Sequence, residues 1–260
     1  MCHLLSNIFS ISLFPFFYKL IPTYIYDMIK EKRGIYVMLK LYTLPIITPV
    51  WTDTDVQLLP FISKQRQEKV LSYRFSIDKK LSLYSALLTR MEISVLSGVL
   101  HQSLHFQSEF MHKPMLLSAP YYHFNFSHTK SMILCGISDT HPIGVDIERI
   151  DPSLNIETMK AVLHQTEFQY INSTYSNHER TDRFYKIWTQ KEAYIKYMGT
   201  GFSANAHAFN MLDPKLSSKL FTWKQDCYLC SVFTDFQNIP SVQTVAESEL
   251  RDYFLSPPLP

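Results

Sequence analysis

The chain has few cysteines, and none of them suggests a disulfide framework. Cys2, Cys135, Cys227 and Cys230 are the four cysteines in 260 residues, too few and too scattered to staple a chain of this size. We therefore expect a reducing, cytoplasmic environment. Cys227 and Cys230 fall within a predicted strand, where residues three apart point to opposite faces. We interpret them as small buried side chains rather than a zinc or redox pair.

Long runs of one residue type are also missing. No run of lysine and arginine exceeds two residues, and the formal net charge is +2, which argues against nucleic-acid binding through bulk phosphate attraction. The apolar stretch 8–18 contains Pro15 and is shorter than the roughly 20 apolar residues of a spanning helix. It also lacks the basic start and the cleavage site of a secretory signal.

Residues 1–37 allow three interpretations. They are a peripheral membrane anchor, an interaction arm, or upstream sequence that precedes a working start at Met38. We favour the last, because the stretch 38–42 has the pattern of a first strand that begins a domain. Membrane contact is expected only if residues 1–37 are translated and exposed.

The remaining chain has an ordinary globular composition, 46% hydrophobic and 18% charged. Its patterns predict an α+β protein of two similar halves, residues 38–140 and 141–255, followed by a tail at 256–260. Each half is expected to hold a long helix and a small antiparallel sheet. In the first half we predict a turn and then two helices between two sets of strands: strands at 38–42, 122–127 and 131–138, a turn at 52–55, and helices at 63–73 and 78–100.

The pattern restarts at Ile143. We predict a strand, three helices and several closing strands: 143–149, 156–163, a short helix from about 166, 182–198, and strands up to about 245. Gly199 and Gly201 follow the long helix, where a stop is expected. No internal sequence repeat is strong enough to demonstrate a duplication.

The first acidic motif is Gly-Val-Asp-Ile-Glu-Arg at 144–149. Carboxylate and aliphatic side chains alternate, so a strand would place Asp146 and Glu148 on one face, about 6.6 Å apart, while Val145 and Ile147 enter the core. A solvated strand face is the ordinary alternative for such alternating charge.

The second acidic motif is the helical stretch 188–196. Trp188, Glu192 and Lys196 recur every four residues and form one stripe. Taken alone, Glu192 and Lys196 match an ordinary surface ion pair, and Trp188 matches a core residue. If the two motifs converge, three carboxylates and a lysine form a site for a hard cation, most simply Mg²⁺, with a phosphate-bearing substrate and a general base.

Two further groups carry polar chemistry. The stretch Phe124–His128 ends a strand in Ser-His, and His128 is either a polar strand terminus or a donor to phosphate. Lys113 precedes Pro114 and follows His112; by default it is a surface lysine.

The order of these motifs resembles the Sfp-type 4′-phosphopantetheinyl transferases from about Met38 to near Phe254. The motifs are a basic helix, Lys-Pro, F-N-x-S-H, G-V-D-I-E and W-x-x-K-E-A-x-x-K-x-x-G-x-G. The resemblance implies a pseudo-twofold fold of two α/β halves. It also implies transfer of the 4′-phosphopantetheine arm of coenzyme A to a serine of an apo carrier protein, which releases adenosine 3′,5′-bisphosphate.

The resemblance also implies roles for particular residues. Asp146, Glu148 and Glu192 would hold Mg²⁺ against the pyrophosphate of coenzyme A, and Lys196 would neutralise the leaving phosphate. His128 and Lys113 would contact the 3′-phosphate end of the nucleotide. Glu192 would in addition take the proton of the serine. Glu167 matches a further acid of the family, without an assigned role.

Two positions depart from the family pattern. Leu81 occupies the slot of a phosphate-binding arginine, and Lys79 and Lys80 are the candidates to replace it. His112 stands where relatives commonly have glycine before Lys-Pro.

We expect a monomeric Mg²⁺-dependent transferase. The alternatives are a Mg²⁺-dependent phosphodiesterase or nuclease, a coenzyme A-binding or carrier-docking protein without turnover, and a membrane-tethered adaptor. The W-x-x-K-E-A form resembles the branch of the family that serves nonribosomal peptide and polyketide synthases, and fatty-acid carriers stay open. Carrier docking is predicted near the segment after Ile150, where Leu154, Ile156 and Met159 are equally well explained as core residues.

Overall fold

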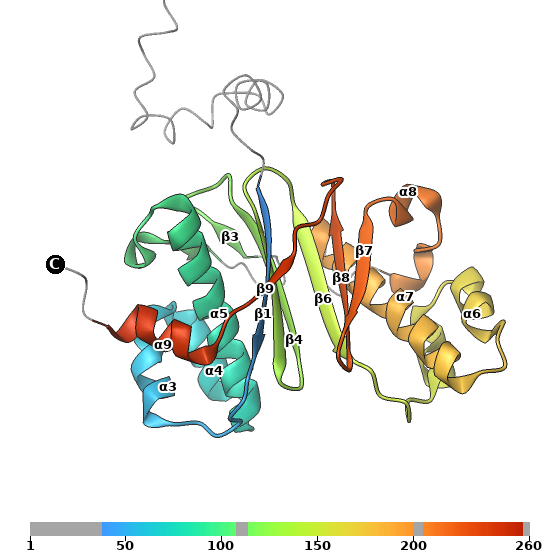
Figure 1. The fold of residues 1–260 in the computed structure, drawn as a ribbon, viewed down its shortest axis with the longest axis horizontal. Coiled ribbons are helices and arrows are strands. Elements are labelled where there is room, and N and C mark those ends of the chain that lie inside the picture. Colours follow the sequence, from blue (N-terminus) through green and yellow to red (C-terminus); the bar gives the residue numbers. More distant parts are fainter. Residues whose placement is uncertain (1–37, 108–113, 200–204, 257–260) are drawn as a thin grey trace, which may run out of the picture.

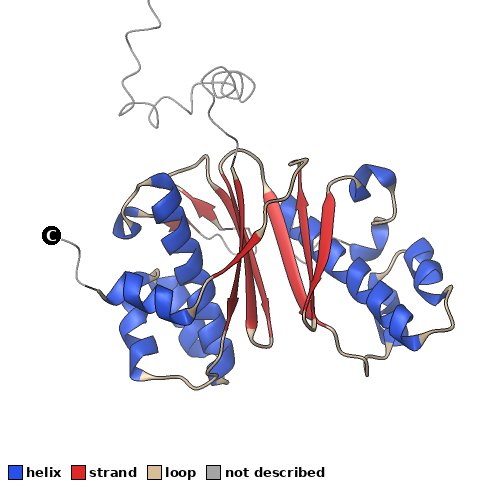
Figure 2. Ribbon diagram, viewed as in Figure 1, coloured by secondary structure: helices blue, strands red, loops and turns tan. Residues whose placement is uncertain are grey.

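The protein is built from two sheets packed face to face, each covered on its outer face by helices (Figure 1). A computed structural model describes residues 38–107, 114–199 and 205–256. With helices and strands coloured separately, the strands form the middle of the molecule and the helices its two sides (Figure 2). This arrangement confirms the predicted α+β fold of two similar halves.

The described residues from Leu39 to Ser138 form the following strands and helices of the first half, in the order of the chain. They are β1 (Leu39–Pro45), α3 (Asp53–Leu58), α4 (Lys64–Ser72), α5 (Ser76–Ser97), β2 (Phe106–Gln107), β3 (Met115–Leu116), β4 (His123–Thr129) and β5 (Met132–Ser138), with short 3-10 helices at Leu59–Phe61 and His101–Ser103.

The second half begins at Ile143, as predicted, and repeats the scheme of a strand, a long helix and two more strands. Its elements are β6 (Ile143–Arg149), a 3-10 helix (Ile156–Val162), α6 (Gln165–Asn172), α7 (Asn177–Met198), a 3-10 helix (Ala206–Ala208), α8 (Pro214–Ser217), β7 (Leu220–Gln225) and β8 (Tyr228–Thr234). The chain ends with β9 (Val242–Thr244) and α9 (Glu247–Leu255).

The strand orders of the two main sheets are β4-β5-β1-β9 and β6-β8-β7. Apolar side chains from both sheets fill the space between them, among them Leu41 and Leu134 from the first sheet and Val145 and Ile147 from β6. The prediction that Val145 and Ile147 enter the core is thus confirmed. Their strand neighbours Asp146 and Glu148 must therefore point the other way, toward α7.

The end of the chain corrects the predicted domain boundary. Strand β9 pairs in parallel with β1, and α9 packs on α5, where Leu250 and Phe254 are buried in the core of the first half. Residues 242–255 therefore belong to the first half, although we had assigned them to the second. The pairing covers an edge of β1 that would otherwise expose its backbone groups. The helix α9 was not predicted at all.

Two smaller predictions are also corrected. The stretch 52–55, expected to be a turn, starts α3 through a capping box in which the Asp55 carboxylate accepts hydrogen bonds from the Thr52 amide and hydroxyl. Cys230 is buried as expected, but Cys227 is exposed in the turn before β8.

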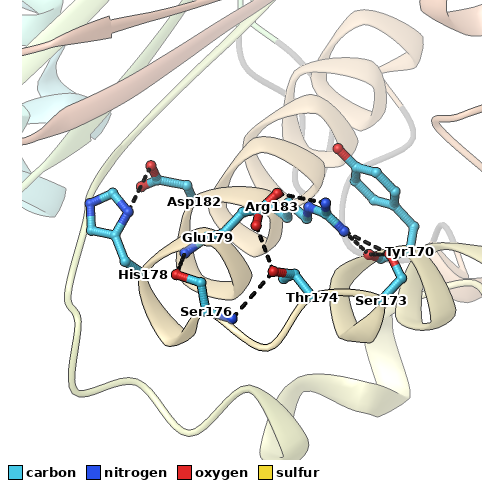
Figure 3. A network of polar contacts seen from close by, with 8 residues as sticks. All are labelled: Tyr170, Ser173, Thr174, Ser176, His178, Glu179, Asp182 and Arg183. Carbon is cyan, nitrogen blue, oxygen red and sulfur yellow. Dashed lines mark hydrogen bonds and ion pairs between the residues drawn. The ribbon is translucent and has the colours of Figure 1, made fainter.

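The start of α7 is held by a polar network with the end of α6 (Figure 3). Arg183 donates to Glu179 (2.6 Å) and to the Tyr170 carbonyl (2.6 Å), and Ser176 caps the helix by accepting from the Glu179 amide (3.3 Å). The network adds a turn to the predicted helix, which begins at Asn177 instead of residue 182.

Within the described residues, the helices lack the combination of length and apolar character that is needed to cross a membrane. The predictions for residues 1–37 concern a segment that lies outside the described part of the chain.

Candidate active site

The site begins with a close approach between strand β6 and helix α7. A Cβ atom at Gly144 would overlap the carbonyl oxygen of Ala193 and the amide nitrogen of Tyr197. Only glycine leaves room for the two backbones to come this near. The contact places the next residues on the same face of β6, Asp146 and Glu148, directly beneath α7.

Asp146 is the most enclosed of the three carboxylates, at 3% exposure. One of its oxygens, Oδ1, accepts hydrogen bonds from the Lys196 ammonium (2.6 Å) and the Ser127 hydroxyl (2.8 Å). The Lys196 ammonium also donates to the Ser127 hydroxyl (2.8 Å). The other oxygen, Oδ2, is buried and has no hydrogen-bond partner among the described residues. A buried carboxylate oxygen without a donor is a costly arrangement, which a bound cation would relieve.

Glu148 lies next to Asp146 and is tied to two elements. The Thr129 hydroxyl of β4 donates to it (3.1 Å), and its carboxylate also accepts a hydrogen bond from the indole N–H of Trp188 on α7. Burial, and then the charge of Asp146, raise the pKa of Glu148. Trp188 therefore faces the carboxylates, as the helical stripe predicted, while its ring also packs on the core of the second half.

Glu192 has a strongly raised pKa. Burial raises its pKa to about 7, repulsion from Asp146 and Glu148 acts in the same direction, and Lys196 opposes the shift. The side chain is 8% exposed, so the interpretation of Glu192 and Lys196 as an ordinary surface ion pair is wrong. The ion pair of Lys196 is with Asp146 instead. A carboxyl group with a pKa near 7 is suited to accept a proton at neutral pH.

The carboxylates fit Mg²⁺ by their chemistry rather than as a finished cage. In the described part of the chain, no three His, Cys, Asp or Glu side chains are grouped closely enough to hold a metal ion together. Mg²⁺ is usually bound by one or two carboxylates, with water and substrate phosphate at the other positions. The partnerless Oδ2 of Asp146 and the raised pKa values of Glu148 and Glu192 are consistent with such a site. Their role as metal ligands stays a prediction.

Positive side chains gather on the other side of the site, around His128 of β4. Burial, followed by the charges of Arg66, Lys196 and Lys69, lowers the pKa of His128 to about 4. The pKa of Arg66 is also lowered by burial, and that of Lys69 by burial and the charge of Arg66. Positive charges close enough to lower the pKa values of His128 and Lys69 form a region that attracts a multiply charged anion.

Arg66 and Lys69 were not predicted as site residues. They lie three residues apart on α4, so they share one face of that helix, and the Arg66 guanidinium lies over the Phe126 ring with 5.2 Å to its centroid. The sequence carried a signal, because both lie in the helix predicted at 63–73, and a basic helix is the first of the motifs that carry the family resemblance. The helical pattern did not indicate which strand this face of α4 would contact.

The structure does not support the nucleotide role predicted for Lys80. Its ammonium is 3% exposed, donates to the Thr48 carbonyl (2.8 Å) and pairs with Glu247 (3.0 Å) of α9. These contacts join α5 to the end of the chain, which makes Lys80 a structural residue. Lys79 is half-buried near the Trp51 ring, at 5.9 Å from its centroid. Lys113 and His112 lie outside the described residues.

Glu167, for which no role was assigned, is fully buried and pairs with Lys191 of the K-E-A motif (2.9 Å). Its carboxylate also accepts from the amides of His164 (2.8 Å) and Met211 (2.7 Å). The pair therefore ties α6, α7 and the segment before α8 together. Of the residues predicted for carrier docking, Ile156 is buried and Leu154 and Met159 pack on the same core, which favours their alternative interpretation as core residues.

Comparison with known proteins gives two matching family models, one for each half. The model described as the 4′-phosphopantetheinyl transferase superfamily matches residues 142–246, and the model described as 4′-phosphopantetheinyl transferase, N-terminal, matches residues 50–138. The first stretch contains the three carboxylates and Lys196, and the second contains Arg66, Lys69 and His128.

Similar proteins include several transferases of bacteria. The 4′-phosphopantetheinyl transferase Sfp of Bacillus subtilis is 28% identical over 194 residues, which cover 74% of this chain and 85% of that protein. The 4′-phosphopantetheinyl transferase gsp of Aneurinibacillus migulanus is 28% identical over 211 residues, 75% of this chain and 86% of that protein. HetI of Nostoc sp. is 31% identical over 100 residues, 38% and 42% of the two chains.

The two family models meet at the junction between the halves. The three carboxylates and Lys196 lie on one side of that junction, and Arg66, Lys69 and His128 lie on the other. With relatives that align over three quarters of the chain, the chain belongs to the 4′-phosphopantetheinyl transferase superfamily and is an enzyme of the Sfp type.

Proposed function

We propose that Asp146, Glu148, Glu192 and Lys196 form the centre at which this enzyme transfers the 4′-phosphopantetheine arm of coenzyme A to a serine of an apo carrier protein. The observation that carries the proposal is the pairing of two opposite features at one junction. Two carboxyl groups with raised pKa values and a third with an unpartnered oxygen lie beside a cluster of basic side chains. Among the described residues, the only carboxylate paired with this cluster is Asp146. A pyrophosphate held through a divalent cation matches both features.

In the proposed reaction, the serine Oγ attacks the phosphorus that carries the pantetheine arm. The bond between that phosphorus and the oxygen that bridges to the second phosphate breaks, and adenosine 3′,5′-bisphosphate leaves with the electron pair. The proton of the serine goes to a base, and no covalent bond to the enzyme forms. The transfer therefore needs positioning, a base and stabilisation of the negative charge that develops.

Glu192 is the residue we assign as the base toward the serine. Its pKa of about 7 leaves a substantial fraction of the carboxylate ionised at neutral pH and keeps it basic enough to take a proton. A positioned base of this kind typically contributes about 10²–10⁴-fold to the rate. Its neighbour Lys196, one helical turn further on, is placed to offset charge on the leaving phosphate.

The metal ligands we propose are Asp146, Glu148 and Glu192, and the ion is Mg²⁺. Bound there, Mg²⁺ would polarise the pyrophosphate and neutralise part of the charge on the leaving group. Lys196 contacts Asp146 through Oδ1, which leaves Oδ2 as the oxygen that faces no donor.

The nucleotide end of coenzyme A is assigned to the cations around His128. Arg66 and Lys69 reach this region from α4, and Phe126 supports Arg66 from beneath. Lys113 and Lys79 stay candidates for the same end, from the resemblance alone. Because His128 has a pKa of about 4, it would meet phosphate as a neutral hydrogen-bond donor unless the bound anion raises that pKa.

A mass measurement tests the proposal. The full chain is incubated with coenzyme A, Mg²⁺ and several apo carrier proteins, including peptidyl, polyketide and fatty-acid carriers, and the mass of each carrier is followed. We expect the mass of the arm to be added to the carrier serine, and a carrier with that serine changed to alanine to gain nothing. Binding of coenzyme A without transfer to any carrier would contradict the proposal and favour a non-catalytic docking protein.

The identity of the carrier pathway stays a prediction, as do the monomeric state and the cytoplasmic location. The panel of carriers addresses the first directly. We expect peptidyl and polyketide carriers to be the better substrates, on the basis of the resemblance to the broad-specificity branch of the family.

A further inference from the structure

A row of hydroxyl groups runs across the second sheet beneath α7 and ends beside Asp146. In the strand register, Thr222 of β7 is opposite Ser231 of β8, and Ser231 is opposite Asp146 of β6. Residues directly opposite one another in antiparallel strands share a face of the sheet. The shared face is the one that α7 covers, because Gly144, two residues before Asp146, meets the backbone of that helix.

The row is joined to α7 by a continuous set of hydrogen bonds. The distances are 2.9 Å from Gln190 Nε2 to Thr222 Oγ1, 3.0 Å from Thr222 Oγ1 to Ser231 Oγ, 2.8 Å from Ser231 Oγ to Thr189 Oγ1, and 2.9 Å from Thr189 Oγ1 to the Tyr185 carbonyl. An amide NH₂ only donates and a carbonyl only accepts, so the two ends set the direction. Each hydroxyl then accepts one bond and donates one, and none is left unsatisfied.

The inner part of the row is more enclosed than its outer end. Thr189 and Ser231 are fully buried, whereas Gln190 and Thr222 also line an open cavity of about 620 Å³ between α7, β7 and the segment around α8. A hydrogen bond that is lost at the inner link leaves a buried hydroxyl without access to water, so the inner link matters most.

The position of α5 that corresponds to Thr189 is apolar. In the first half, Leu88 of α5 stands ten residues before the terminal Gly98, as Thr189 of α7 stands ten residues before Gly199. Leu88 is fully buried in the apolar core. The two halves therefore differ at this position, and in the second half the hydroxyl pair lies next to the carboxylate cluster, because Ser231 is opposite Asp146.

We propose that the hydrogen bond between Thr189 and Ser231 is a positioning contact of the active site, and this inference rests on the proposed function. Ser231 is opposite Asp146, and Thr189 lies about one turn before Glu192 on α7. The bond fixes how far α7 is shifted along the strands. It thereby sets the position of Glu192 relative to Asp146, which apolar packing alone holds less specifically.

An isosteric pair of variants separates the hydroxyl from the shape of the side chain. Thr189→Val keeps the shape and removes the hydroxyl, and Thr189→Ser keeps the hydroxyl. Ser231→Ala removes the other partner. Thr89→Val is the matched control, because Thr89 is a buried threonine of α5 whose hydroxyl bonds to the Ser85 carbonyl of its own helix and contacts Cys135.

We expect Thr189→Val and Ser231→Ala each to lower kcat by about tenfold, with the KM for coenzyme A within about twofold of wild type, the size expected for one hydrogen bond. Thr189→Ser should recover most of the loss. The double variant should lose no more than about twofold beyond the single variants, since all remove the same link. Affinity for Mn²⁺ in the presence of coenzyme A, measured by electron paramagnetic resonance, should weaken by about tenfold in parallel.

The inference is overturned if Thr189→Val lowers kcat no more than Thr89→Val does, if the two losses multiply in the double variant, or if Mn²⁺ affinity is unchanged. Unfolding temperatures of all variants identify losses that merely follow stability. Absence of transfer by the wild-type protein would instead reject the proposed function, so the two failures are distinguishable.

Discussion

Each half of the molecule contains a long helix of the same length, but the two helices have different roles. Helices α5 and α7 both contain 22 residues, and each ends at a glycine with a φ of 69°. Eight residues before that glycine stands a buried cation, Arg90 in α5 and Lys191 in α7. Each cation donates to two backbone carbonyls of the segment that follows its helix.

The match extends to the aromatic ring beneath each cation. The Arg90 guanidinium lies 4.8 Å from the centroid of Phe106, and the Lys191 ammonium lies 4.3 Å from the centroid of Phe209. This common device ties the segment after each long helix back to the helix. It is a structural correspondence that the sequence alone did not reveal, since no repeat was apparent.

The halves differ at the next positions along the helix. Met91 and Val95 of α5 correspond to Glu192 and Lys196 of α7, counted from the terminal glycines. The strands beneath the two helices differ in the same way. Tyr42 of β1 packs in the core beneath α5, whereas Asp146 of β6 pairs with Lys196 of α7. One scaffold thus serves packing in the first half and chemistry in the second.

The largest expected effect concerns the two buried glutamates. Glu192→Gln should reduce transfer by roughly 10²–10⁴-fold, because it removes the proposed base and a metal ligand. Glu92→Gln, in the first half, should stay within a few-fold of wild type, since Glu92 is 9% exposed and hydrogen-bonds to Tyr42. Rates are measured by the mass of the carrier. Near-normal activity of Glu192→Gln would remove this residue from the centre and break the contrast between the halves.

A glycine in each half gives the second test. Gly144→Ala should push α7 away from β6, and a displacement of this kind costs about 10²-fold in activity. Gly98→Ala meets no atom within 4 Å, so it should preserve activity and lose only about 1–2 kcal/mol of stability from its left-handed backbone. Activity and thermal unfolding are compared for both. If Gly144→Ala folds and transfers normally, the close approach has no role in the site.

The buried cations allow a third test, on stability. Lys191→Met should lower the free energy of unfolding by about 3–5 kcal/mol, because it leaves Glu167 buried without its partner. Arg90→Met leaves two carbonyls without a donor and should cost less, about 1–3 kcal/mol.

Urea unfolding measures both values. Adding Glu167→Gln to Lys191→Met should recover part of the lost free energy of unfolding, because it removes the unpaired charge. Arg90→Met leaves no such charge, so no second substitution of this kind is expected to rescue it. Equal losses for Lys191→Met and Arg90→Met would show that the ion pair adds nothing to the shared device.

The smallest effect is the pH dependence of stability. The pKa of Glu192 is raised from its ordinary value of 4.5 to about 7, so the folded state favours the protonated form. Its contribution to stability is present below about pH 4.5 and is lost as the pH rises through 7, by on the order of 1–3 kcal/mol.

Thermal unfolding in the presence of EDTA measures this loss. Wild type should lose stability between pH 5 and 8 relative to Glu192→Gln, and Mg²⁺ should restore part of it at pH 8. A wild-type profile parallel to that of Glu192→Gln would mean that Glu192 has an ordinary pKa in the folded protein.

Local patterns in the sequence determined which residues share a face of a strand or helix and where the second half begins. Alternation placed Asp146 and Glu148 on one face of β6, a spacing of four placed Trp188 and Glu192 on one face of α7, and the restart at Ile143 marked the second half. These features depend on periods of two and about 3.6 residues, which the chain carries within each segment. The order of the motifs then identified the family.

Only the tertiary structure decided which partners those faces meet. It paired Lys196 with Asp146, brought Arg66 to His128, and returned residues 242–255 to the first half. It also placed Lys80, a candidate for nucleotide binding from the sequence, in an ion pair with Glu247 of α9. Such contacts join residues far apart in the chain, and helical or strand periodicity contains no information about which face packs on which. The packing of the two halves supplies it.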